Sequence, residues 1–284
     1  MQIFLKQARS FHQLGERANQ EDARYPDYDF PPADQRVFVV CDGVGGHDCG
    51  EIASASVCRG FAEYTSDERP DLSYRIKDFQ YALGQAYHSL YQEIERTGIT
   101  NMGTTLTFAF FHADGVTLAH MGDSRIYQIR PGIGVIYRSN DHSLVGELVR
   151  KREMTQAEAE ASEFGNVITR CITAVPEGRD FPKAEIYESN DVQPGDIFLL
   201  CTDGVLSSLP ESDLVTFLAN PQASLADKAT LLAAESESSS DNNTAYLVEV
   251  DSVINDRGDS GLFRRITEAG PKFKRSSLLD ELFD

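Results

Sequence analysis

Short apolar runs that end at an aspartate are the feature that most restricts the fold of this 284-residue chain. Three runs have this form: VFVVCDG (37–43), LAHMGDS (118–124) and IFLLCTDG (197–204). A short apolar run followed by polar turn residues is typical of a buried strand. The sequence therefore predicts sheets whose strands carry acidic side chains at their carboxyl ends.

The middle run belongs to a series of strand-like segments separated by turn residues. These segments are TLTFAFF (105–111), VTLAHM (116–121), RIYQIR (125–130) and VIYR (135–138). Because tight turns join antiparallel neighbours, the four segments are expected to form a meander. A further strand is expected at residues 244–250, after a polar run.

Helical patterns alternate with the strand-like blocks. From Leu72 to Ile94, apolar residues recur at steps of three and four, which places them on one face of a helix that covers a sheet. Weaker helical patterns occupy residues 50–64, 154–162 and 224–236. The expected helix at 154–162 would begin with a capping box made by Thr155 and Glu158. Together the patterns predict an α+β fold with two antiparallel sheets packed face to face and flanked by helices.

A change in composition near Asp251 divides the chain. Residues 1–250 are expected to form one domain, and residues 251–284 a flexible or partner-docking tail. The basic residues of this tail, which are expected to be attracted to the acidic body, are Arg264, Arg265, Lys272, Lys274 and Arg275. Its last apolar residues are Leu278, Leu279, Leu282 and Phe283. The apolar group is expected to form a helical turn that docks on a partner or on the domain.

Charge and cysteine usage exclude several classes of partner. Acidic residues outnumber basic ones by 45 to 26, so a net charge of −19 repels nucleic acids and anionic membrane surfaces. The five cysteines are scattered without a CxxC pair, which favours a reducing cytoplasm over a disulfide framework. No apolar run approaches the roughly 18 residues that span a bilayer. We expect a cytoplasmic monomer without membrane insertion.

The stretch VVCDGVGGHDCGE (39–51) joins a strand to a glycine-rich edge. Such an edge can cradle a phosphate, turn a hairpin or hold a metal ion, and a single Asp-Gly pair is most often a turn. The joint pattern is more informative, because strand-end carboxylates that gather on one side repel one another unless a cation compensates. The candidate ligands are Asp42, Asp123, Asp203 and Asp241. An all-oxygen site of this kind suits Mg²⁺ or Mn²⁺ rather than zinc.

The order of motifs along the chain resembles that of a known family. The motifs are GERANQEDA (15–23), VVCDGVGG (39–46), NMGTTLTF (101–108), AHMGDSRIY (119–127), NDHSLV (140–145), NVITRCI (166–172), LLCTDGV (199–205) and SDNNTAYLV (240–248). Over roughly residues 5–250 the chain is similar to the PP2C (PPM) metal-dependent protein serine/threonine phosphatases, in their short bacterial form. The resemblance implies the α-β-β-α sandwich of that family, with a dinuclear metal site at one end.

The resemblance also implies a role for each matching residue. Asp42 would bridge two Mn²⁺ or Mg²⁺ ions, and the carbonyl of Gly43 would complete the shell of the first. Asp203 and Asp241 would bind the second ion, while Glu21 would reach the metals through water. The implied reaction is attack on phosphorus by a water held between the two ions.

Further positions carry supporting roles by the same resemblance. Asp22 would orient the metal ligands by hydrogen bonding, and Arg17 would bind the substrate phosphate. Asp123, together with Asp203, would contribute to a weaker third ion, although an aspartate in this position is also a common turn residue. Residues 144–165 match the flap subdomain of the family.

Several positions depart from the family or have an ordinary structural explanation. Val44 stands where many eukaryotic members have a histidine proposed as general acid, and Ser207 stands where many relatives have another carboxylate for the third ion. Residues 162–165, SEFG, replace the usual histidine-proline-arginine of the flap. His142 is expected to be a hydrogen-bonded structural histidine rather than a catalyst.

The sequence favours an active phosphatase that reverses a cognate serine/threonine kinase on phosphoprotein substrates. The alternative is a phosphatase-like module that binds phosphoproteins with little activity. A cysteine phosphatase is excluded, because none of the five cysteines has an arginine six positions later. An EF-hand calcium protein is excluded as well, because no D-x-[DN]-x-[DN]-G loop occurs.

Overall fold

The computed structural model describes residues 1–44, 49–66, 76–155, 158–159, 162, 164, 167–176, 178–255 and 262–272. Its strands are β1 (Gln2–Leu5), β2 (Arg9–Gln13), β3 (Asp22–Tyr25), β4 (Val37–Val44), β5 (Gly103–Thr104), β6 (Leu106–His112), β7 (Gly115–Met121), β8 (Arg125–Arg130), β9 (Gly134–Arg138), β10 (Ile172–Thr173), β11 (Ala184–Ser189), β12 (Ile197–Cys201), β13 (Asn243–Ile254) and β14 (Arg264–Ala269). Its helices are α1 (Gly50–Ser66), α2 (Ile76–Thr97), α3 (Leu144–Arg150), α5 (Asp203–Ser207), α6 (Glu211–Leu218) and α7 (Leu225–Ser236).

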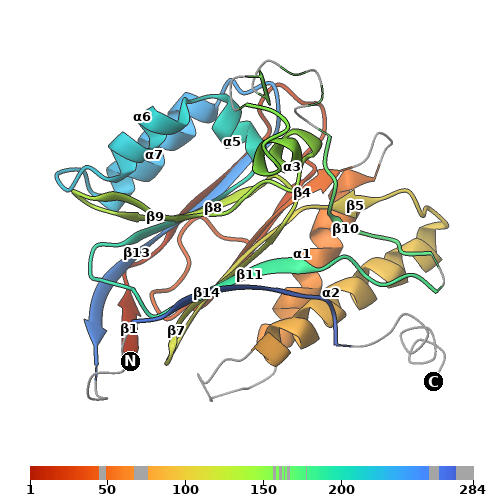
Figure 1. The fold of residues 1–284 in the computed structure, drawn as a ribbon, viewed down its shortest axis with the longest axis horizontal. Coiled ribbons are helices and arrows are strands. Elements are labelled where there is room, and N and C mark those ends of the chain that lie inside the picture. Colours follow the sequence, from red (N-terminus) through yellow and green to blue (C-terminus); the bar gives the residue numbers. More distant parts are fainter. Residues whose placement is uncertain are drawn as a thin grey trace.

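Two antiparallel sheets form the centre of the molecule. The larger sheet has eight strands in the order β10-β5-β4-β6-β7-β11-β14, with β3 paired to β4. The smaller sheet has six strands in the order β1-β13-β12-β8-β9, with β2 paired to β13. Figure 1 shows α1 and α2 on the outer side of one sheet and α6 and α7 on the outer side of the other. The α+β sandwich expected from the sequence is confirmed.

Aromatic side chains fill the space between the two sheets. Phe38 of the larger sheet meets Tyr246 of the smaller one, with ring centroids 5.2 Å apart. Phe111 and Phe198 make an edge-to-face contact across the same layer, at 5.0 Å. All four side chains are buried. Because buried aromatic pairs in this geometry add about 0.5–1.5 kcal/mol beyond area burial, they help to fix how the sheets face each other.

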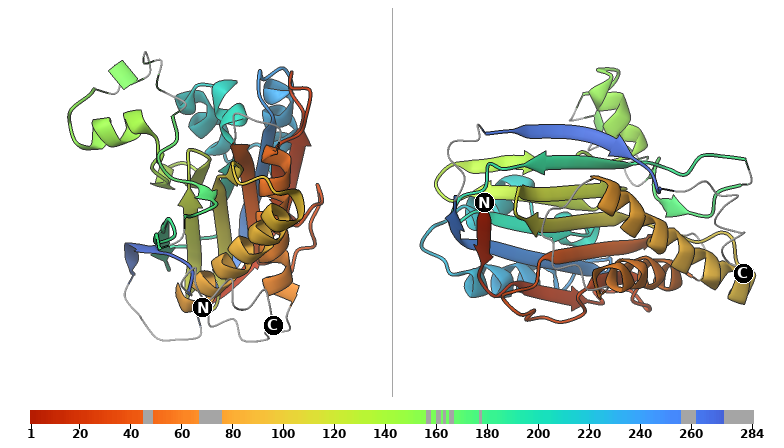
Figure 2. Two further views of the ribbon diagram at one scale, coloured as in Figure 1. Left: turned by 90° about the vertical axis from the view of Figure 1, so that its right-hand side faces the viewer. Right: turned by 90° about the horizontal axis from the view of Figure 1, so that it is seen from below.

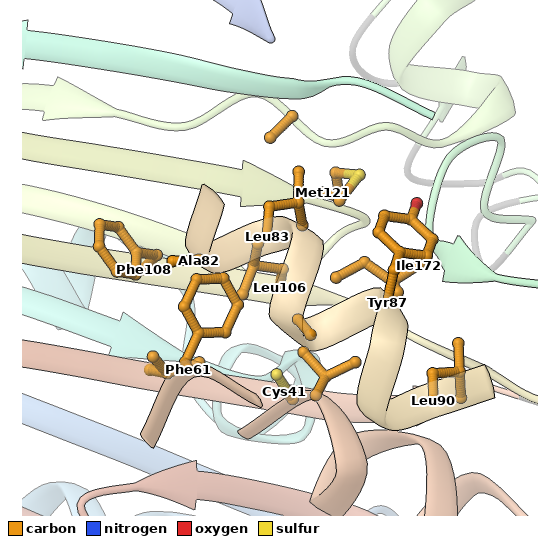
Figure 3. Close-up of a cluster of buried hydrophobic side chains, with 14 of the residues drawn as sticks. Cys41, Phe61, Ala82, Leu83, Tyr87, Leu90, Leu106, Phe108, Met121 and Ile172 are labelled. Atoms are coloured by element: carbon orange, nitrogen blue, oxygen red, sulfur yellow. The ribbon is translucent and has the colours of Figure 1, made fainter. Parts of the chain in front are cut away.

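The outer core of the larger sheet lies under α2. Its buried residues include Phe79, Leu83 and Leu90, at the three- and four-residue steps seen in the sequence. Figure 3 shows Leu83 and Tyr87 over strands that carry Leu106 and Met121. Truncating one such buried leucine to alanine would cost ~2–5 kcal/mol, so the stripe holds the helix to the sheet. The expected helix is confirmed from residue 76, and residues 72–75 lie outside the described part.

The expected capping box between Thr155 and Glu158 is present. The amide of Thr155 donates to Glu158 Oε2 over 2.8 Å, and the amide of Glu158 donates to Thr155 Oγ1 over 3.3 Å. The rest of the expected helix at 154–162 includes residues outside the described part of the chain.

The expected four-stranded meander is wrong at its central turn. β6 pairs with β7, and β8 pairs with β9, but β7 continues to β11 and β8 to β12. Gly122, at a φ of +102°, lies in the turn that carries the chain from the larger sheet to the smaller one. A tight turn normally joins antiparallel neighbours, but here both strands are buried on their two faces, and packing assigned them to different sheets.

Part of the expected tail belongs to the sheets. β13 runs to Ile254, which pairs with Gln2 of β1, and all of β14 pairs antiparallel with β11. β14 is held by ion pairs that join Arg264 to Asp191 and Arg265 to Glu188. Residues 251–254 and 264–269 are therefore parts of strands and not of a flexible tail, whereas the expected attraction of the basic residues to the acidic body is confirmed for Arg264 and Arg265. The expected helical turn at 278–283 lies outside the described residues.

Within the described residues, no helix has the combination of length and apolar composition that crossing a bilayer requires. The segment expected as a flap contains α3, which projects from the body near one end of the sheets in both views of Figure 2. The same end carries α5 in Figure 1. The candidate site therefore lies at the end of the sandwich that α3 and α5 share.

Candidate metal centre

Asp22 and Asp42 face each other on neighbouring strands. The register of β3 and β4 places them directly opposite one another. Asp22 is buried, and its Oδ2 accepts a hydrogen bond from the hydroxyl of Thr202 over 3.0 Å. The backbone of Asp42 is bonded at both polar atoms to Thr105, whose amide donates to the Asp42 carbonyl (2.8 Å) and whose hydroxyl accepts from the Asp42 amide (2.9 Å). The pairing of two strands thus brings two carboxyls together.

Glycines allow the backbone and Glu21 to approach this pair. The Gly43 amide donates to the carbonyl of Glu21 over 3.0 Å. A Cβ at Gly50 would lie 2.9 Å from the Gly43 carbonyl oxygen and 3.0 Å from Glu21 Oε2. Two candidate oxygen ligands therefore converge above Gly50, where a side chain would displace them. Sequence reasoning missed Gly50; Gly45 and Gly46 lie outside the described residues.

Asp203 and Asp241 are supplied by the smaller sheet. Asp203 opens α5 directly after β12, and Asp241 precedes β13, which is the antiparallel neighbour of β12. The charge of Asp203 is among the causes that raise the pKa of Asp42, so the two carboxyls act on one another across the two sheets. Since Asp42 belongs to the larger sheet, the site is closed only when the two sheets pack.

Arg17 lies at the rim of this cluster. Its Nη2 donates to Asp241 Oδ2 over 2.7 Å, and about half of its side chain is exposed. The hydrogen bond to Asp241 raises the pKa of Arg17, and the charges of Asp241, Glu21 and Asp42 act in the same direction. A guanidinium in this position can bind an anion that enters from solvent while it still faces the carboxylates.

Asn242 was missed by sequence reasoning, although it lies in the SDNN motif beside Asp241. Its Oδ1 accepts the amide of Glu21 over 2.8 Å, and its Nδ2 donates to the carbonyls of Leu14 (2.8 Å) and Asn19 (2.9 Å). These three bonds hold the loop that carries Arg17 and Glu21. Its place next to a candidate ligand was the signal that could have identified it.

The carboxyls of the site raise one another's pKa values. Burial raises the pKa of Asp22 to about 7, and the charges of Asp203 and Asp241 add to the effect. The pKa of Asp42 is raised well above its usual range, by burial first and then by four neighbouring aspartates. Burial and then Asp241 raise the pKa of Asp203. The site is short of positive charge.

Asp123 lies beside the same cluster. It follows β7, and burial together with the charge of Asp203 raises its pKa to about 7. The adjacent Ser124 hydroxyl lies 2.7 Å from that of Thr105, which also bonds to Asp42. Ser207 donates its hydroxyl to the carbonyl of Gly204 over 3.0 Å. The structure thus brings Asp123 to the carboxylates.

The residues present fit divalent cations bound by oxygen. Asp22 Oδ1 and Asp203 Oδ1 are buried and have no hydrogen-bond partner. Leaving a buried carboxylate oxygen without a partner is costly, and a cation would remove that cost. The donor set consists of carboxylates and a backbone carbonyl, as Mg²⁺ and Mn²⁺ prefer. All eight residues proposed from the sequence, Arg17, Glu21, Asp22, Asp42, Gly43, Asp123, Asp203 and Asp241, lie at this end of the sandwich.

Comparison with known proteins gives a consistent result. The sequence profile of protein phosphatase 2C matches residues 12–236. The chain is 29% identical over 235 residues to the serine/threonine protein phosphatase PstP of Mycobacterium tuberculosis, covering 82% of this chain and 43% of PstP. It is 30% identical over 237 residues to the protein phosphatase PhpP of Streptococcus pneumoniae, covering 82% of this chain and 93% of PhpP.

A solved structure agrees with these sequence relatives. The crystal structure of the catalytic domain of PstP in complex with two manganese ions matches with a TM-score of 0.71 and 27% identity. The match covers 88% of this chain and all of that one. The chain spans less than half of the full PstP sequence but all of that catalytic-domain structure.

Proposed function

Because the chain belongs to the protein phosphatase 2C family, we propose that it is a protein serine/threonine phosphatase that depends on Mn²⁺ or Mg²⁺. The observation that carries the proposal is a cluster of buried and half-buried carboxyls, in which one oxygen each of Asp22 and Asp203 is buried without a hydrogen-bond partner, with a half-exposed arginine at its rim. The manganese ions bound by the catalytic domain of PstP support the same metal here.

Two ions would be held by Asp42, the carbonyl of Gly43, Asp203 and Asp241, with Glu21 in reach through water. A weaker third ion would use Asp123 and Asp203. When bound, the ions would supply the Lewis acidity that activates a water and offsets charge on the phosphoryl oxygens.

The chain's own residues orient the reacting groups. Arg17 presents a planar guanidinium whose donors match two phosphate oxygens, so it would hold the phosphoryl group in a defined orientation. Asn242 fixes the loop that carries Arg17 through its bonds to Leu14 and Asn19. Thr202 fixes Oδ2 of Asp22, while Oδ1 is buried and has no hydrogen-bond partner.

The substrates would be phosphoproteins carrying phosphoserine or phosphothreonine, and the natural counterpart would be a serine/threonine kinase. Phosphoprotein substrates follow from the family, whereas a partner kinase, a monomeric state and a cytoplasmic location are proposals from the sequence. A module that binds phosphoproteins without hydrolysing them is the other outcome that the experiment below can reveal.

The test is release of phosphate from a phosphothreonine peptide, with EDTA, Mg²⁺ and Mn²⁺ compared. We expect turnover with either ion and none with EDTA. Retention of the peptide without phosphate release in Mn²⁺ would identify a binding module instead. Arg17→Ala should mainly raise KM, with a smaller loss in kcat. The KM of Arg17→Lys should lie between those of the wild type and Arg17→Ala, because lysine keeps the charge but not the planar guanidinium. An unchanged KM in both variants would remove Arg17 from the phosphate site.

A further inference from the structure

A buried cluster outside the metal centre consists of His120, His142 and Glu185. One nitrogen of each histidine and one oxygen of the glutamate lie within 4.8 Å of one another. These three side chains are at most 8% exposed, and the atoms His120 Nδ1, His142 Nε2 and Glu185 Oε1 have no hydrogen-bond partner. The register of β7 and β11 places His120 directly opposite Glu185. The imidazole of His142 stacks on that of His120, with centroids 4.6 Å apart.

Hydrogen bonds around the rings argue against a cation in this cluster. His120 Nε2 lies 2.7 Å from the carbonyl of Asn140, so it carries the proton and leaves Nδ1 as an acceptor. His142 Nδ1 lies 3.2 Å from the amide nitrogen of Gly122 and accepts its proton, so Nε2 carries the ring proton. Nε2 of a neutral His142 then has no lone pair to offer a metal. The charges of Arg150 and Arg170 also lower the pKa of both histidines, after burial.

The same bonds give His142 a different role. Besides accepting the amide of Gly122, His142 donates its own backbone amide to the Gly122 carbonyl over 2.8 Å. Both polar backbone atoms of Gly122 are therefore held by one residue. We infer that His142 is a positioning residue that sets the place of Asp123 by holding Gly122, and that it links this turn to the base of the flap.

The turn has little freedom on its other side. Gly122 has a φ of +102°, and a Cβ there would lie 2.6 Å from Cγ2 of Thr105. Thr105 in turn contacts Ser124 and the backbone of Asp42. The turn at Gly122 is thus in contact with Thr105 on one side and with His142 on the other. A loss of the His142 bonds would therefore move Asp123 relative to Asp42.

His142 is also bonded to the segment that follows the flap. Its carbonyl accepts the amide of Thr169 over 2.7 Å and the Thr169 hydroxyl over 3.0 Å. That hydroxyl lies 2.8 Å from Oε1 of Glu147 in α3. The bridge between Ser143 and Ile168 closes the same base. A displacement of α3 would therefore be transmitted to Asp123 through His142.

This inference rests on the proposed function only for the role of Asp123 as a metal ligand. The test compares His142→Leu, which fills the space without an acceptor, with His142→Asn, whose Oδ1 can take the place of Nδ1. The first measurement is amide hydrogen exchange at Gly122, made without substrate. We expect exchange about tenfold faster in the leucine variant, from the loss of one hydrogen bond, and near the wild-type rate in the asparagine variant.

The second measurement is Mn²⁺ binding, followed by the electron paramagnetic resonance of free Mn²⁺ and by the metal dependence of hydrolysis. The dissociation constant of the weakest Mn²⁺ site should rise by about 10- to 100-fold in His142→Leu, which is the usual effect of losing a residue that orients a ligand. The shift should vanish in an Asp123→Asn background, since both changes act on one ligand. His142→Asn should recover most of the affinity.

Two controls separate positioning from loss of stability. Glu185→Gln changes the cluster without touching Gly122, and His112→Leu removes another buried histidine, which lies 3.0 Å from the Thr117 hydroxyl. Both should leave Gly122 exchange and Mn²⁺ binding unchanged. The inference is overturned if His142→Leu leaves both readouts unchanged, if His142→Asn is as impaired as His142→Leu, or if the Asp123 background leaves the full shift. An inactive wild-type protein would contradict the proposed function but not the exchange result.

Discussion

Two groups of buried and half-buried aspartates in this protein have opposite electrostatic surroundings. At one end of the smaller sheet, Asp196 accepts two hydrogen bonds from Arg130, at 2.7 Å and 2.8 Å. Arg130 also bonds to Asp191, which Arg264 approaches from β14. At the other site the nearby charges are mainly those of other carboxylates. The aspartates concerned are Asp22, Asp42, Asp123 and Asp203.

The pKa values record this difference. Burial pushes the pKa of Asp191 upward, but hydrogen bonds from Arg264 and Arg130 outweigh it and the net pKa is lowered. The pKa values of Asp22 and Asp123 are raised to about 7 by burial and repulsion. The first group is neutralised by the protein's own cations and serves the fold. The second group of aspartates carries negative charge that only a bound cation can neutralise, so it serves function and lowers the stability of the metal-free protein.

The largest expected effect is that of Asp42→Asn. Hydrolysis in Mn²⁺ should fall by several orders of magnitude, because this carboxyl is the proposed shared ligand of two ions. The metal-free variant should nevertheless melt at a higher temperature than the wild type, because one repelling charge is removed. Steady-state kinetics and calorimetry in EDTA test both parts. Full activity in saturating Mn²⁺ would refute the proposed metal site.

Asp196→Asn should give the opposite pattern. It leaves Arg130 buried with one carboxylate fewer, so the free energy of unfolding should fall by about 3–5 kcal/mol. Below the melting transition, kcat and KM should match those of the wild type. Urea unfolding with activity measured in parallel checks this. If Asp196→Asn lost activity without losing stability, the two groups would not be independent.

The pH dependence of metal-free stability should distinguish the groups further. Asp22 and Asp123 have folded pKa values of about 7, above the unfolded value of 3.8, so the folded state binds more protons between those pH values. Their favourable contribution is complete at acid pH and is lost as the pH rises through 7.

We therefore expect the metal-free free energy of unfolding to fall by about 5 kcal/mol between pH 5 and pH 8, because each of the two carboxyls contributes about 1.4 kcal/mol per pH unit below pH 7. Added Mn²⁺ should stabilise the protein more at pH 8 than at pH 5, and calorimetry with and without EDTA measures the difference. The double variant Asp22→Asn, Asp123→Asn serves as control and should flatten the metal-free profile. A stability that rises with pH in EDTA would contradict the assigned repulsion.

The smallest effect is expected for Arg264→Ala. Arg264 is half-exposed, and Asp191 keeps its bond to Arg130, so the loss should be about 1 kcal/mol or less. Activity should not change. Thermal melting at low and high salt is the measurement, and the difference from the wild type should shrink at high salt. A loss as large as that of Asp196→Asn would show that β14 contributes more to the fold than its ion pairs suggest.

The sequence by itself determined the features that depend on local spacing or on residue type. The three- and four-residue steps of Phe79, Leu83 and Leu90 indicated the covered face of α2, since a helix turns every 3.6 residues. The aspartates that follow apolar runs indicated the ligand type, and their order with Arg17 indicated the family. These signals lie within a few residues of one another along the chain, or in the order of motifs.

Only the tertiary structure decided which distant segments meet. The turn at Gly122 looked like a hairpin, but burial of both faces of β7 and β8 sent these strands to different sheets. The segment that forms β14 has the composition of a tail. In the structure it pairs with β11, and its arginines bind acidic residues in and next to β11. Gly50 and Asn242 gained their roles, and His142 the positioning role inferred for it, only when the loops closed around them. Such contacts depend on the summed packing of residues far apart in sequence, which no local pattern encodes.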